Sequence, residues 1–132
     1  MENKYVLVSG GSKGIGYGIV QNLIKNGYYP IILDIIEPEN LSNILYYEVD
    51  FLDLEGAKAV LKKICAKYEI LRLVNNVGIV KPDFLEHSKL EDYLEVIKIN
   101  SMSAIICLQA VLPSMEKAKF GRVVSITSRT IL

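Results

Sequence analysis

The sequence predicts a single α/β domain, residues 1–132, built on a doubly wound parallel sheet. Short apolar runs rich in Val, Ile and Leu alternate with longer segments of helical periodicity along the chain. A glycine-rich turn, residues 9–16, joins the first apolar run to the first helical segment. Right-handed crossovers between parallel strands then give the strand order 3-2-1-4-5, with helices on both faces of the sheet.

The first elements surround the glycine-rich turn. Residues 4–9 form a β-prone run, and residues 15–26 have the periodicity of a helix that Gly27 ends. A second strand is expected at 29–34. A connection over 35–43 is too short for a full crossover helix, so we expect a turn there.

The remaining elements continue the alternation. A third strand is expected at 44–49, a helix capped by Asp53 and ending near Tyr68, and a fourth strand at 71–75. A loop over 79–87 follows. Ser88 and Glu91 form a capping box for a long helix that reaches Ala110 or beyond, and Pro113 should kink or end it. Residues 122–127 are the fifth strand.

Charge and cysteine usage narrow the classes of partner and favour a cytoplasmic protein. Fifteen basic residues balance fifteen acidic ones, so there is no electrostatic reason to expect nucleic acid or an anionic membrane as a partner. The chain runs from Met1 straight into the first strand, and the longest apolar stretch, 105–112, is too short to span a bilayer. Cys65 and Cys107 fit buried free thiols. With His87 as the one histidine, no metal site is expected.

The glycines of the turn suit a nucleotide. Gly10 lets the chain turn out of the strand, Gly14 lets the backbone approach a pyrophosphate, and Gly16 lets the helix pack on the sheet. The helix N-terminus offers free N–H groups to phosphates. A tight turn without a ligand is the alternative. The spacing G-x-x-x-G-x-G, read as Ser-Gly-Gly-Ser-Lys-Gly-Ile-Gly, resembles the short-chain dehydrogenase/reductase family, a Rossmann-type fold, and the resemblance adds Ser12, Lys13 and Ile15 to the cofactor-binding set.

The resemblance implies a nicotinamide cofactor. Asp34 ends the second strand, where a carboxylate accepts hydrogen bonds from ribose hydroxyls and repels a 2′-phosphate, which favours NAD over NADP. Lys13 could pair with a 2′-phosphate and so favours NADP, but the carboxylate of Asp34 should outweigh it. Asp50 matches the acid near the adenine, although a simple turn residue is equally consistent. Residues 75–78 resemble Asn-Asn-Ala-Gly, so that Asn76, Val77 and Gly78 border the cofactor.

Two further residues correspond to catalytic positions of the family. Residues 121–128 resemble the strand that delivers the family's catalytic serine, here Ser128. The resemblance implies that its hydroxyl hydrogen-bonds the substrate oxygen. Asn100, a poor helix former inside the long helix, matches the asparagine that supports a proton-relay water. A polar residue on a solvated helix face is the alternative for Asn100.

The family's Tyr-x-x-x-Lys pair does not occur here: none of the eight tyrosines has a lysine four residues later. We therefore expect the C-terminal part of the family fold to be missing from residues 1–132. A fragment of a full enzyme, a natural truncation or a non-catalytic cofactor-binding protein would explain this. The fifth strand would be an open edge and the long helix would lack neighbours, which implies homodimers or homotetramers for the complete protein. The apolar positions of that helix are Val96, Ile97, Ile105, Ile106, Leu108 and Val111.

Three functions follow from this sequence. The first is an oxidoreductase that moves hydride between NAD and a secondary alcohol or ketone. The second is a module that binds NAD without turnover. The third is a methyltransferase using S-adenosylmethionine, which shares the early strand–glycine–helix plan; the 75–78 turn and the Ser128 strand argue against it.

Overall fold

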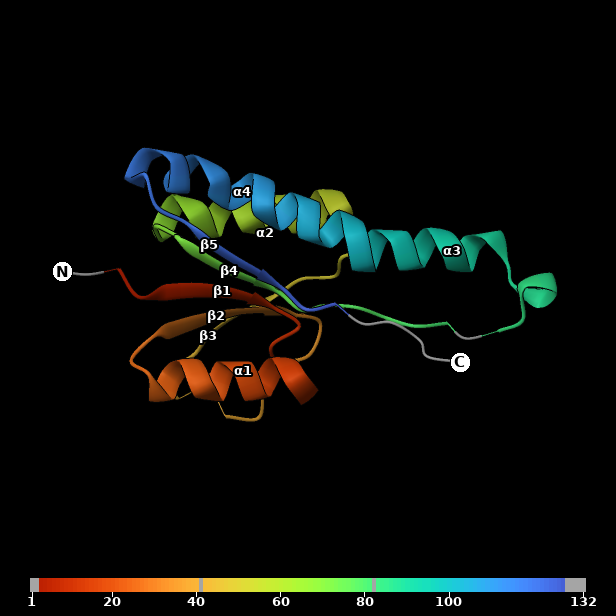
Figure 1. The fold of residues 1–132 in the computed structure, drawn as a ribbon, viewed down its shortest axis with the longest axis horizontal. Coiled ribbons are helices and arrows are strands. Elements are labelled where there is room, and N and C mark those ends of the chain that lie inside the picture. Colours follow the sequence, from red (N-terminus) through yellow and green to blue (C-terminus); the bar gives the residue numbers. More distant parts are fainter. Residues whose placement is uncertain (1–2, 41, 82, 128–132) are drawn as a thin grey trace.

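A computed structural model describes residues 3–40, 42–81 and 83–127. It contains the expected five-stranded parallel sheet in the order β3-β2-β1-β4-β5 (Figure 1). In register, Leu7 of the central strand lies opposite Ile31 on one side and Leu73 on the other. The strands are β1 (Tyr5–Ser9), β2 (Tyr29–Asp34), β3 (Leu45–Glu48), β4 (Arg72–Asn75) and β5 (Arg122–Ser125).

Helices cover both faces of the sheet (Figure 1). On one face, Val8 and Ile32 pack with Val20 of α1; on the other, side chains such as Leu7 pack with α2 and α4. This division follows from the alternation of side chains along each strand. The helices are α1 (Gly14–Lys25), α2 (Leu54–Lys67), the 3₁₀ turn η1 (Leu85–His87), α3 (Leu90–Ile97), the π-helical turn η2 (Lys98–Met102) and α4 (Ser103–Ala118).

One of the two predicted helix N-caps is confirmed and the other is wrong. Asp53 caps α2, because its carboxylate accepts a hydrogen bond from the N–H of Gly56 at 3.0 Å. The capping box of Ser88 and Glu91 is wrong: Lys89 precedes α3 and makes no side-chain cap bond. The Ser88 hydroxyl instead donates to the carbonyl of Phe84 at 2.9 Å, closing the preceding 3₁₀ turn.

Pro113 does not end the long helix, since α4 continues to Ala118. Val111 and Met115 on either side of it are buried in the core that α4 shares with α2 and the sheet. That burial offsets the roughly 3 kcal/mol that a proline costs inside a helix. The helix ends where Lys119 adopts a left-handed conformation with φ of 52°.

The long helix is also more extensive than the apolar run 105–112 implied. Residues Leu90–Ala118 form a continuous helical stretch of 29 residues, which by length and composition alone is sufficient to cross a membrane. This is weak evidence for a membrane, because core helices of soluble proteins meet the same criterion. The shortness of the apolar run 105–112 therefore does not by itself exclude a span.

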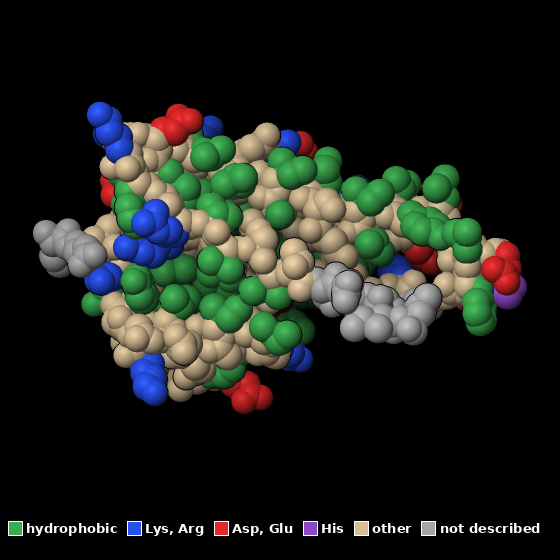
Figure 2. All heavy atoms as spheres, in the orientation of Figure 1, with side chains coloured by type: hydrophobic (Ala, Val, Ile, Leu, Met, Phe, Trp, Pro, Cys, Tyr) green, Lys and Arg blue, Asp and Glu red, His purple; other side chains and the backbone are tan. Residues whose placement is uncertain are grey.

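The apolar positions of the long helix were expected to lack neighbours, and this is wrong for Ile106 and Val111. Ile106 and Val111 are buried against the core, whereas Ile97 and Ile105 are about half exposed, at 51% and 49%. Figure 2 shows hydrophobic side chains along the surface of α3 and α4. Val123 and Val124 of the edge strand β5 are exposed on both sides of the sheet, as predicted for an open edge.

Candidate functional site

The glycine-rich turn packs directly on the start of α1. Gly10 and Gly14 have φ of +69° and +56°, in the left-handed region that glycine adopts without strain. A Cβ at Gly16 would lie 1.9 Å from the carbonyl oxygen of Gly10. Glycine at position 16 therefore allows the first turn of the helix to lie against the end of β1.

The ends of β1 and β4 are joined by side chains. The amide of Asn76 donates to the carbonyl of Gly10 at 2.9 Å. The Ser9 hydroxyl accepts the backbone N–H groups of Asn76 and Val77 at 3.0 and 3.2 Å. Ser9 is a site residue that the sequence analysis missed; a polar residue ending a buried apolar strand was the available signal. These bonds fix the crevice between β1 and β4, where such sheets bind ligands.

Asp34 is held at the mouth of this crevice. One carboxylate oxygen accepts the N–H of Ser12 at 3.1 Å, and the other accepts the N–H groups of Ile35 and Ile36 at 2.8 and 3.4 Å. The Tyr46 hydroxyl donates to the Asp34 carbonyl at 3.2 Å. Burial raises the pKa of Tyr46, with added repulsion from nearby acids such as Glu48 and Asp34, so this hydroxyl remains a donor.

A cavity of about 440 Å³ lies beyond the carboxyl ends of the strands. It brings together seven of the predicted cofactor residues: Gly10, Lys13, Asp34, Asp50, Asn76, Val77 and Gly78. Apolar residues that the sequence analysis did not select complete its wall: Ile35, Ile36, Val49, Phe51, Leu52, Ile79 and Ile99. Five of them lie within two residues of the strand-end acids at 34 and 50, which was the available signal, whereas Ile79 and Ile99 had no such signal.

Four predicted cofactor residues do not line this cavity. Ser12 is buried beneath it, where its N–H holds Asp34 and its hydroxyl donates to the carbonyl of Ile36. A Cβ at Gly14 would meet no described atom within 4 Å, so the turn is open there. Gly16 packs so closely against Gly10 that no side chain fits there. Ile15 is 70% exposed and lines a separate depression along α1.

Asp50 forms a turn and also lines the cavity. Its carboxylate accepts the N–H of Leu52 at 2.9 Å, which makes a turn, and the residue also lines the cavity. The turn presents Leu52 to the cavity.

Asn100 lies in the π-helical turn η2, within the long helical stretch between α3 and α4. Its side-chain oxygen accepts the N–H of Ile79 at 2.7 Å, and its amide donates to the carbonyl of Ile79 at 2.8 Å. Although the residue is exposed, these two hydrogen bonds hold it against the segment that follows β4. The predicted catalytic Ser128 lies outside the described residues.

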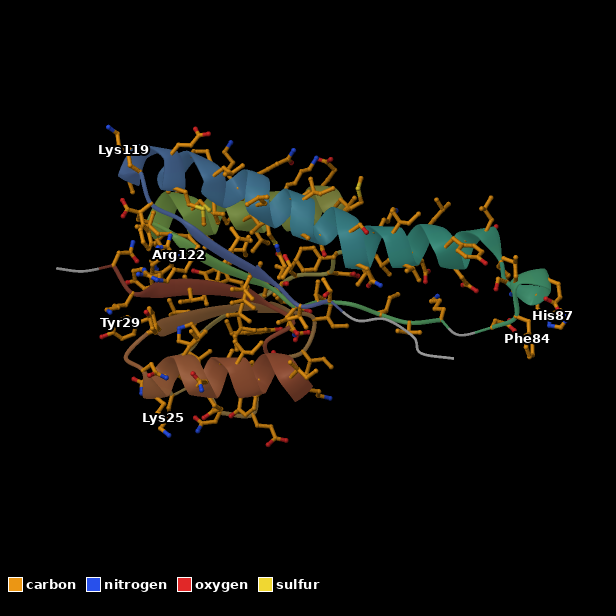
Figure 3. The ribbon with its side chains drawn as sticks, in the orientation of Figure 1. Lys25, Tyr29, Phe84, His87, Lys119 and Arg122 are labelled. Atoms are coloured by element: carbon orange, nitrogen blue, oxygen red, sulfur yellow. The ribbon has the colours of Figure 1, made fainter. Side chains whose placement is uncertain are left out.

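Other candidate groups stand apart from the cavity. His87 is exposed at the tip of η1, where its ring contacts Phe84 edge-on (Figure 3). In the described part of the chain, no three His, Cys, Asp or Glu residues gather as a metal site. Cys65 and Cys107 are free thiols, and burial raises the pKa of Cys107 to about 12.

The fold and the crevice define a nucleotide-binding α/β protein, and comparison with known proteins identifies its family. The family model described as short chain dehydrogenase matches residues 4–131, so the chain belongs to the short-chain dehydrogenase family. A 3-amino-tetrahydro-pyrrolizinone reductase of Xenorhabdus hominickii is 33% identical over 97% of this chain and 46% of its own length. The 3-oxoacyl-acyl-carrier-protein reductase FabG of Salmonella typhimurium is 31% identical over 96% and 55%.

Solved structures agree. Ligand-free aldohexose dehydrogenase of Thermoplasma acidophilum superposes with a TM-score of 0.88 at 27% identity, over 96% of this chain and 50% of its own. ElxO with NADP bound superposes with a TM-score of 0.84 at 30% identity, over 96% and 56%. The chain thus spans about half the length of the proteins it matches.

Proposed function

We propose that this chain is the NAD(P)-binding domain of an oxidoreductase that transfers hydride between a nicotinamide cofactor and a secondary alcohol or ketone. The observation that carries the proposal is the cavity at the β1–β4 crevice, bounded by the glycine-rich turn, Asp34 and the 76–78 turn. The reductase and dehydrogenase names of the relatives support the reaction class.

The cavity walls suit the parts of a dinucleotide. The open backbone at Gly14 and the N-terminus of α1 would receive the pyrophosphate, with Lys13 beside it. Asp34 would accept hydrogen bonds from the adenosine ribose, and the apolar side chains of Phe51 and Leu52 with Asp50 would border the adenine. When bound, the cofactor would supply the hydride acceptor or donor; the chain's part is to bind and orient it.

We infer a preference for NAD. Three backbone N–H groups hold the Asp34 carboxylate in place, so it cannot turn aside from a 2′-phosphate without leaving these donors unpaired. Lys13 lines the same cavity and favours a phosphate. The carboxylate should prevail, because it would lie directly against the added charge, although the related ElxO binds NADP.

On the substrate side, we propose Ser128 and Asn100 as the catalytic contributions of this chain. A Ser128 hydroxyl would donate to the substrate oxygen as charge develops there. Asn100 fixes Ile79 at the cavity wall and, by family resemblance, would support a proton-relay water. Oxidation of the alcohol sends its hydride to the nicotinamide and its hydroxyl proton to a base.

We also propose a cytoplasmic homodimer or homotetramer for the complete protein. The exposed apolar surface of α3 and α4, including Ile97 and Ile105, is the face that would be covered. A zero formal charge offers no attraction to nucleic acid or anionic lipid.

Titration of the purified full-length gene product with NADH and NADPH tests the proposal, with Asp34→Ala in parallel. We expect tighter binding of NADH, a loss of about 10-fold or more on substitution, and a reduced preference over NADPH. Hydride transfer to or from a panel of secondary alcohols and ketones then separates an enzyme from a module that binds without turnover. Stabilisation by S-adenosylmethionine but not by NADH would contradict the proposal.

A further inference from the structure

Residues 78–81 form a wall shared by two cavities. Gly78 and Ile79 line the cavity at the glycine-rich turn. Ile79, Val80 and Lys81 line a second cavity of about 290 Å³ on the side of α3. The position of this short segment therefore sets the shape of both.

The segment is fastened to the long helix at two places. The first is the pair of hydrogen bonds between the Asn100 side chain and the backbone of Ile79. The second is Lys81, whose ammonium donates to Asp92 at 3.2 Å and also to Glu95. Between the two, Val80 is 82% exposed and contributes little packing of its own.

Lys81 joins two acids that would otherwise repel each other. Asp92 and Glu95 are three residues apart on one face of α3, so their carboxylates are neighbours. One ammonium between them offsets that repulsion. The hydrogen bonds that Lys81 donates to Glu95 and then to Asp92 raise the pKa of Lys81, so it stays cationic at neutral pH.

We propose that Lys81 is a positioning residue that, through Asp92 and Glu95, fixes the wall 78–81 for hydride transfer. Asn100 alone holds the backbone at one residue, whereas Lys81 adds a second anchor two residues on and stops the segment from pivoting about Ile79. The catalytic consequence rests on the proposed function; the anchoring itself does not.

The experiment uses the full-length gene product with Lys81→Ala, Lys81→Arg and, as a matched control, Lys89→Ala from the same connection between β4 and α3. Amide hydrogen exchange of residues 78–81 measures the anchor without any turnover. NADH affinity and kcat/KM for hydride transfer measure its effect on the site. Partly exposed ion pairs are modest, so the expected changes are modest.

We expect Lys81→Ala to raise exchange of the 78–81 amides about fivefold and to lower kcat/KM by a similar factor, mostly in kcat, with NADH affinity within about twofold of the original. Lys81→Arg should restore both readouts and Lys89→Ala should leave both unchanged. Exchange and kcat/KM in Lys81→Ala equal to the unmodified protein would overturn the proposal. So would an equal loss in Lys81→Arg. If the unmodified protein neither binds NADH nor transfers hydride, the proposed function fails. The anchoring role of Lys81 would be refuted separately, by unchanged hydrogen exchange in Lys81→Ala.

Discussion

Replacing Gly16 with alanine should separate α1 from the glycine-rich turn. The added Cβ would lie 1.9 Å from the Gly10 carbonyl oxygen and 2.4 Å from the amide nitrogen of Asn76. The first neighbour is backbone and cannot move alone, so the helix start must shift. The second makes the 2.9 Å bond that joins the ends of β1 and β4.

The cost follows from these two contacts. Overpacking against backbone costs about 1–3 kcal/mol, and losing a partly buried hydrogen bond adds about 1 kcal/mol. The expected loss in free energy of unfolding is therefore about 2–4 kcal/mol, a fall of roughly 5–15 °C in Tm. Cofactor affinity should fall as well, because the shifted helix start no longer faces the crevice.

Gly18→Ala is the matched control in the same helix. A Cβ there meets no described atom within 4 Å, and alanine is the better helix former. The free energy of unfolding should therefore stay level or rise by about 0.5–1 kcal/mol, and Tm should not fall. Thermal melts of the full-length product, with and without NADH, compare the two variants. Equal melting temperatures and equal NADH shifts would refute the packing argument.

Two further predictions concern the long helix. Asn100→Ala removes both bonds to Ile79, so hydrogen exchange at the Ile79 amide should rise and the free energy of unfolding should fall by about 1 kcal/mol; unchanged exchange there would contradict the anchor. Cys107, with its pKa raised to about 12 by burial, stays a neutral thiol in the folded protein and should resist thiol reagents at pH 8 until the protein unfolds. The same shift in pKa contributes stability that is complete below the ordinary thiol pKa of 9.0 and is lost as pH rises toward 12. Peptide mapping measures the labelling of Cys107, and thermal melts between pH 8 and 10 measure the stability.

The strand order and the principal elements were predictable because local signals and topology agree. Alternating apolar runs, Gly27 at the end of α1 and Asp53 at the start of α2 each specify their own neighbourhood. The strand order 3-2-1-4-5 in turn puts the switch point of the sheet between β1 and β4, where ligands bind in such folds.

The failures arise where tertiary contacts decide. Ser88 fits a capping box in sequence, but its hydroxyl is taken by the preceding turn. Pro113 fits a helix end, yet burial of its neighbours Val111 and Met115 carries the helix through it.

The candidate site shows the same division. Strand-end residues such as Asp34 and Asn76 could be predicted to lie at the site, because the topology brings the ends of the strands together. The anchoring role of Ser9 and the ion pairs of Lys81 were not, since each depends on partners distant in sequence. Ile15 was selected as part of a motif, and its exposed side chain lines a separate depression instead of the cavity.

Hydrogen exchange of the full-length product with and without saturating NADH tests the central claim most directly, because it locates the cofactor on this chain. We predict protection at residues 10–14, 34–36 and 76–79, with weaker protection under NADPH at equal concentration. Binding of NADH that leaves these three segments unprotected, or no binding at all, would contradict the assignment of the crevice as a dinucleotide site.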